Sequence, residues 1–241
     1  MFSIRVPTRR GGRDEAEKPF WISFADLMTS LMVLFLVTMA VALLAATKTQ
    51  SDEEKAQKAR EDAIEQVREM IREAVRNTPG FQFQNDTITM VNDNLGPQAQ
   101  FDFGKHALRA QDARKLRQLA PELLRAANSE AGSRWLRRFV IEGFTDEVGG
   151  YLRNLNLSLM RSERALCALL APPDADETPL TPDELRTIRE RFLVGGFSFN
   201  SLKASAEESR RIELRVEFRD LDESPEARPQ AVSGGHEACP I

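Results

Sequence analysis

The stretch WISFADLMTSLMVLFLV, residues 21–37, lies in an apolar run from Phe20 to Ala46 that contains one charged residue, Asp26. At about 1.5 Å per residue, a helix of this length extends for about 40 Å, which exceeds the hydrocarbon thickness of about 30 Å. We therefore predict one transmembrane helix over residues 20–46. An acid within such a helix is energetically costly, so Asp26 is a candidate functional residue.

The residues around this run bear on how it is oriented and whether it is kept. Ala40-Val41-Ala42 has the small-x-small form of a signal-peptide cleavage site, but the run is longer than a signal core and contains an acid. Cleavage therefore remains the less favoured alternative. Basic residues are slightly more numerous before the run than after it, which favours a cytoplasmic N-terminus. They are Arg5, Arg9, Arg10, Arg13 and Lys18 before it, and Lys48, Lys55, Lys58 and Arg60 after it.

The composition disfavours a conventional enzyme. The chain has 241 residues, a net charge of -4 and only two histidines, His106 and His236. No group of residues has metal-ligand spacing, and neither a Walker-type glycine loop nor a Gly-x-Ser-x-Gly elbow occurs. We expect no enzymatic activity, no metal, no cofactor and no direct nucleic-acid binding.

Outside the apolar run, the sequence divides into four further segments. We expect a short tail at 1–19, a helical linker at 47–80, a compact domain at 81–220 and a disordered tail at 221–241. The linker has a narrow apolar stripe at steps of three and four residues, which fits either a coiled-coil seam or a solvated connector helix. The stripe consists of Ile64, Val67, Ile71 and Ala74.

The compact domain is expected to be a mixed α/β structure. Its order is strand, strand, helix, strand, helix, short helix, strand, strand, which is typical of a two-layer sandwich with helices on one face of a mixed sheet. The proline at 121 is expected to kink or restart its helix. The expected strands include 87–92, 98–103, 134–144 and 210–218, with a turn at 93–97; the expected helices are 116–127, 156–170 and one beginning after Thr181.

The polar residues that we interpret as a binding site lie in IEGFTDEVGGYLRNLNLSLMRSERA, residues 141–165. In order, they are Gly143, Thr145, Asp146, Asn154, Leu157, Ser158 and Arg161. This order and spacing resemble the OmpA-like peptidoglycan-binding family, whose signature runs Gly-His-Thr-Asp, Asn, Leu-Ser and Arg-Ala. The resemblance covers residues 86–219. It implies an α+β protein in which the helices are followed by an OmpA-like domain that binds peptidoglycan.

The ligand implied by this resemblance is the diaminopimelate of the cell-wall stem peptide, which carries an ammonium and a carboxylate on one carbon. Asp146 would hold the ammonium, and Arg161 would grip the carboxylate with two parallel hydrogen bonds. The alternative is an internal salt bridge between Asp146 and Arg161. Two residues depart from the family pattern and alter the expected pocket: Phe144 replaces the usual histidine, and Glu213 stands where an asparagine is expected.

With a wall-binding domain downstream, the apolar run resembles the membrane helix of MotB-type stator B subunits of ion-driven motors. The matching residues are Trp21, Ala25, Asp26, Met28 and Thr29. Within that group, Ile-Ser-Phe-Ala-Asp-Leu-Met-Thr is most similar to the B subunits of Zorya anti-phage defence complexes. The resemblance implies a bacterial inner-membrane protein with a periplasmic C-terminal domain. It also implies that a ring of MotA-like (Zorya A) subunits surrounds a dimer of this chain.

Asp26 is expected to act as the ion carrier. Burial disfavours the charged form of a carboxyl group, so an acid enclosed by helices can bind and release a proton. Thr29 and Ser30 would support the ion path with their hydroxyl groups, unless these only bond to their own helix. The apolar surroundings favour H⁺ over Na⁺. The alternatives are a solvated Asp26 in a passive wall tether, and a flagellar-type stator subunit.

Overall fold

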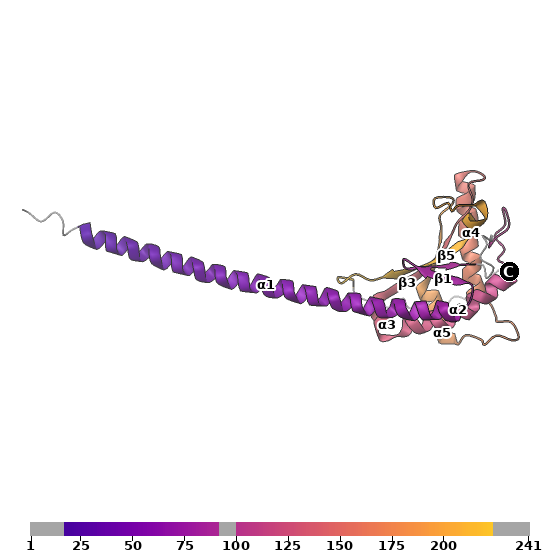
Figure 1. Ribbon diagram of the computed structural model, residues 1–241, viewed down its shortest axis with the longest axis horizontal. Helices are drawn as coiled ribbons and strands as arrows, with labels where there is room; N and C mark the ends of the chain where they lie inside the picture. The colour runs from indigo at the N-terminus through magenta and orange to yellow at the C-terminus, as the bar shows by residue number, and fades with distance from the viewer. Residues whose placement is uncertain (1–16, 92–99, 224–241) are drawn as a thin grey trace, which may run out of the picture. The chain divides into compact units, whose positions relative to one another are not determined.

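The computed structural model describes residues 17–91 and 100–223. It divides into two compact units, Met1–Ala56 and Gln57–Ile241. The expected turn at 93–97 and most of the two expected tails lie outside the described residues. Elements are labelled as in Figure 1.

Helix α1 spans Glu17–Asn77. The described part of the first unit is the N-terminal part of this helix. This helix contains the predicted membrane helix and residues 47–77 of the predicted linker without a break between them. Every side chain from 21 to 50 is exposed in the single chain. Among the described residues, α1 is the one helix long and apolar enough to cross a membrane.

The second unit contains a five-stranded mixed sheet with the order β1-β2-β5-β3-β4 (Figure 1). β3 and β4 are parallel, and the other neighbouring pairs are antiparallel. This confirms the α+β fold with a mixed sheet. The strands are β1 (Phe81–Gln84), β2 (Thr87–Met90), β3 (Leu136–Gly143), β4 (Phe192–Gly196) and β5 (Ile212–Phe218). The helices are α2 (Ala110–Asn128), α3 (Glu130–Trp135), α4 (Tyr151–Leu170), α5 (Pro182–Arg191) and α6 (Ala206–Ser209).

One face of the sheet packs against helices, and the opposite face is charged. Leu214 of β5 is in register with Ile88 of β2 and with Ile141 of β3, and all three are buried in the core. Because side chains alternate across a strand, their neighbours point to the other face. That face carries the cross-strand ion pairs Arg138–Glu217 at 2.6 Å and Arg215–Glu142 at 2.9 Å. The expected two-layer arrangement is therefore confirmed.

The C-terminal part of α1 belongs to the second unit, which differs from both expectations for the linker. Val67 and Ile71 are fully buried in the same core as the sheet. Arg68 forms two hydrogen bonds of 2.7 Å with Asp86, in the turn between β1 and β2. An apolar stripe shows that a helix packs against something but does not identify its partner. Here the partner is the domain itself.

The first hairpin also differs from expectation. β1 and β2 are joined by Asn85 and Asp86, which have φ of 49° and 56°. Positive φ at both central residues is typical of a type I′ hairpin turn, so the Asn-Asp pair was an unrecognised hairpin signal. The expected strand at 98–103 forms no strand in its described part, 100–103. There the side chain of Gln100 accepts a hydrogen bond from the backbone nitrogen of Ile212 at 2.7 Å.

Two expectations about helix ends have clear outcomes. The capping box that begins α5 is confirmed: the Thr181 hydroxyl accepts from the backbone of Glu184, whose carboxylate accepts from the backbone of Thr181. The expected restart at Pro121 does not occur, because α2 continues through it as one helix.

Candidate functional site

Asp26 lies in the part of α1 that is long and apolar enough to cross a membrane. The hydroxyl of Thr29 donates to the backbone oxygens of Ala25 at 3.0 Å and Asp26 at 2.9 Å. This is the back-bonding alternative considered for Thr29. Asp26, Thr29 and Ser30 lie within about one turn, so they share one side of the helix.

Two glycines at the ends of parallel strands bring α4 close to the sheet and so position the second candidate site. Gly143 ends β3 and is in register with Gly196, which ends β4. A Cβ atom on Gly143 would lie 1.9 Å from the carbonyl oxygen of Ser158, and one on Gly196 would lie 2.8 Å from the Ser158 hydroxyl. Only glycine permits this approach. The chain then passes from β3 through Asp146 into α4.

Asp146 is almost fully buried, and both of its carboxylate oxygens are bonded. Oδ1 accepts from the backbone nitrogen of Val148 at 3.2 Å. Oδ2 accepts from Nη1 of Arg210 at 2.9 Å. The predicted site acid is therefore held by a turn on one side and by an arginine on the other.

Asn154 stabilises the same turn from the first part of α4. Its side-chain nitrogen donates to the carbonyl oxygen of Val148 at 3.2 Å, and the residue is buried. Gly149 lies between Val148 and α4 with φ of 110°, which favours glycine. Asn154 thus acts on the loop that contains Asp146.

Arg161 is fully buried and donates to three backbone carbonyl oxygens. Its bonds reach Lys105 at 3.0 Å, Phe144 at 2.7 Å and Asp102 at 3.4 Å. Burial lowers the pKa of the Arg161 guanidinium to about 10, against the opposing effect of the Asp146 carboxylate. Asp146 pairs with Arg210 instead, so the internal Asp146–Arg161 salt bridge is not the arrangement in this structure.

Sequence reasoning did not assign a binding role to Arg210 or to the loop at 101–105. Nε of Arg210 donates to the carbonyl oxygen of Phe101 at 3.3 Å, while Arg161 binds the carbonyls of Asp102 and Lys105. Both arginines therefore fasten this loop beside Asp146. Arg210 lies two positions before β5, so its place next to an alternating strand was the available sequence signal. The loop was expected to be a strand.

The two departures from the family pattern have structural partners. Phe144 is buried, stacks on Phe197 with ring centroids 5.5 Å apart, and lies under the guanidinium of Arg211 at 4.2 Å. Glu213 accepts from Nε of Arg211 at 2.7 Å and pairs with Lys203 at 3.4 Å. Both residues therefore contact Arg211, the residue after Arg210.

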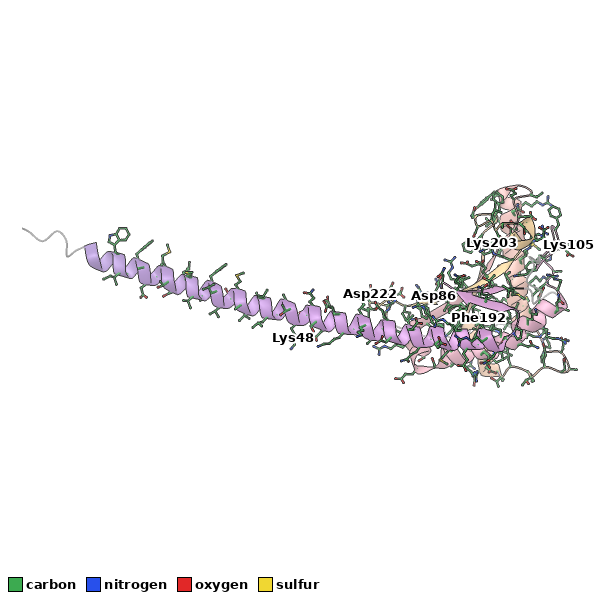
Figure 2. All side chains as sticks on the ribbon, in the orientation of Figure 1. Lys48, Asp86, Lys105, Phe192, Lys203 and Asp222 are labelled. Carbon is green, nitrogen blue, oxygen red and sulfur yellow. The ribbon has the colours of Figure 1, made fainter. Side chains whose placement is uncertain are left out.

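The site combines one carboxylate with nearby arginines at one end of the domain. Figure 2 shows Lys105 and Lys203 toward this end and Asp222 toward the other. An acid and an arginine 2.9 Å apart match the opposite charges of a zwitterion, whose ammonium and carboxylate can exchange with the internal partners. The site thus presents one carboxylate and one guanidinium as groups that a ligand of opposite charges could bind.

Comparison with known proteins defines the family. Residues 7–59 match the family model described as membrane MotB of the proton-channel complex MotA/MotB. Over 225 residues, the chain is 41% identical to Zorya protein ZorB of Escherichia coli O139:H28 (strain E24377A / ETEC), covering 92% of this chain and 89% of that protein. The chain belongs to the ZorB family, which confirms the resemblance seen in the membrane helix.

Solved structures similar to this chain include the three that follow. A putative MotB-like protein from Desulfovibrio vulgaris is 18% identical, with 71% of this chain and 98% of that chain covered and a TM-score of 0.40. A periplasmic domain of Helicobacter pylori MotB is 12% identical, with 59% and 83% covered and a TM-score of 0.38. The OmpA-like domain of FopA1 from Francisella tularensis subsp. tularensis SCHU S4 is 13% identical, with 58% and 82% covered and a TM-score of 0.34.

Proposed function

We propose that this chain is the B subunit of a proton-driven Zorya-type motor in the bacterial inner membrane. Two observations carry the proposal. The chain is 41% identical to ZorB over 92% of its length, and its apolar run contains a single acid. The same identity favours a Zorya complex over a flagellar stator. The N-terminus is cytoplasmic, and the second unit is periplasmic.

Asp26 carries the transported ion. A dimer of this chain lies within a ring of MotA-like (Zorya A) subunits, which enclose the carboxylate. Moving one charge through a membrane potential of 100 mV supplies about 2.3 kcal/mol, so each protonation cycle of Asp26 can drive a rearrangement of the surrounding helices. Ser30 lies on the same side of the helix and supports the ion path. Thr29 supports it when its hydroxyl exchanges its bonds to the backbone oxygens of Ala25 and Asp26 for a bond to the ion path.

The second unit binds peptidoglycan through Asp146, Asn154 and Arg161. The Asp146 carboxylate exchanges Arg210 for the ammonium of diaminopimelate, and the released Arg210 is then available to the ligand's carboxylate. Arg161 acts by positioning the 101–105 loop, because its own donors are directed at backbone oxygens. Anchoring is mechanically necessary, since a motor that drifts freely in the membrane transmits no useful torque.

Phage protection and subunit assembly, measured together, test this proposal. Cells that produce Asp26→Asn with the partner subunit are expected to lose protection, while the two subunits still co-purify. Asp52→Asn is the matched control, because Asp52 is an exposed acid on the same helix beyond the apolar run. Full protection with Asp26→Asn would leave a passive tether as the better explanation.

Wall binding has its own test. Asp146→Asn is expected to reduce retention of the full chain by isolated peptidoglycan, with Asp222→Asn as a control at the other end of the domain (Figure 2). Equal retention of the two variants and the unmodified chain would refute the assignment of Asp146.

A further inference from the structure

The loop at 101–105 is fastened at several points. Besides the bonds from Arg161 and Arg210, the backbone nitrogen of Lys105 donates to the carbonyl oxygen of Asp102 at 3.0 Å. Gly104 has φ of 68°, which allows the tight turn. The backbone on both sides of Phe103 is therefore fixed relative to the Asp146 site.

Phe103 nevertheless presents its ring to solvent. The residue is 61% exposed, whereas Phe101, two positions earlier, is buried and lies 4.9 Å from the Arg161 guanidinium. On the other side of Asp146, Val148 is 58% exposed and donates its backbone hydrogen to the carboxylate. Two exposed apolar side chains thus lie on loops that are bonded either to Asp146 itself or to Arg210 and Arg161.

We propose that Phe103 is a stacking platform for a sugar ring of the glycan strand that carries the bound stem peptide. This inference rests on the proposed wall binding. In peptidoglycan the stem peptide is attached to an N-acetylated hexose, and two residues separate that sugar from the diaminopimelate, so a side chain near the diaminopimelate site but outside it can meet the sugar. The C–H groups on one face of a pyranose are attracted to the electron-rich face of an aromatic ring. Because the phenyl ring of Phe103 has no polar group, it suits the C–H face of the sugar rather than the edge that carries the hydroxyl groups.

The test compares two probes on the full chain in detergent: a diaminopimelate-containing tripeptide, and the same tripeptide attached to its disaccharide. Phe103→Ala is expected to weaken binding of the disaccharide-tripeptide about threefold to tenfold and to leave tripeptide binding unchanged. Phe103→Trp retains the platform and should bind both probes as tightly as the unmodified chain. Leu152→Ala is the control, because Leu152 is 75% exposed on α4.

The outcomes separate this inference from the proposed function. Equal weakening of both probes by Phe103→Ala, or no weakening of either, would overturn the sugar platform while leaving wall binding intact. Failure of the unmodified chain to bind either probe would overturn wall binding and the platform together. Asp146→Asn should weaken both probes.

Discussion

Replacing Ile71 with alanine tests whether the C-terminal part of α1 is an integral part of the second unit. Ile71 is 0% exposed, and the substitution removes three carbon atoms from the core. At about 0.8 kcal/mol per buried methylene, the transfer loss is about 2.4 kcal/mol, and the cavity left behind extends the expected loss to about 2–5 kcal/mol. Met70, the neighbouring residue, is 36% exposed, so Met70→Ala should cost about 1 kcal/mol or less.

Urea unfolding of the full chain in detergent measures this difference. The chain has two tryptophans, Trp21 in the apolar run and Trp135 in the domain, so a Trp21→Phe background restricts the fluorescence signal to the domain. Similar free energies of unfolding for Ile71→Ala and Met70→Ala would refute the reasoning. The C-terminal part of α1 would then be a solvated connector helix, which is one of the two interpretations of the linker sequence.

Three further predictions concern the stability of the second unit. Gly143→Ala should destabilise it by about 1–3 kcal/mol or prevent its folding, because the new Cβ would meet Ser158 oxygen at 1.9 Å; Gly150→Ala, with open space around it, is the control in the same urea assay. Thr181→Ala should cost about 1 kcal/mol through loss of the helix cap, and Thr181→Ser much less, as a shift in thermal midpoint would show. Burial raises the pKa of the Glu142 carboxyl despite Arg215, so the folded state binds more protons than the unfolded state, and Glu142 makes stability fall as pH rises above about 4.5. Glu142→Gln should remove this contribution, so the free energy of unfolding should fall less steeply with pH than in the unmodified chain, and an unchanged slope would contradict the assignment.

The parts of the fold that were predictable are those specified by local pattern. The alternation in β5 identifies a strand with one buried face, and the Thr181 capping box marks the start of α5. The hairpin of β1 and β2 was missed, because its signal is the backbone conformation of Asn85 and Asp86 rather than hydrophobic alternation. The packing partner of the linker stripe was not predictable, because periodicity is the same for any partner.

The site was predictable in its residue types and less so in its connections. Spacing indicated Asp146, Asn154 and Arg161, and the structure places Asp146 and Asn154 around one loop. The role of Arg161 in fastening the 101–105 loop depends on contacts across 56 to 59 positions of the chain, which no local pattern records. The same is true of Arg210, which reaches Asp146 from the segment just before β5.

Proton flux through the reconstituted complex is the most direct test of the central claim. The chain and its partner subunit are placed together in liposomes, a membrane potential is imposed, and the pH change inside is followed with a fluorescent dye. The account predicts flux with the unmodified chain and with Asp52→Asn, and none with Asp26→Asn in an intact complex. Undiminished flux with Asp26→Asn would contradict it.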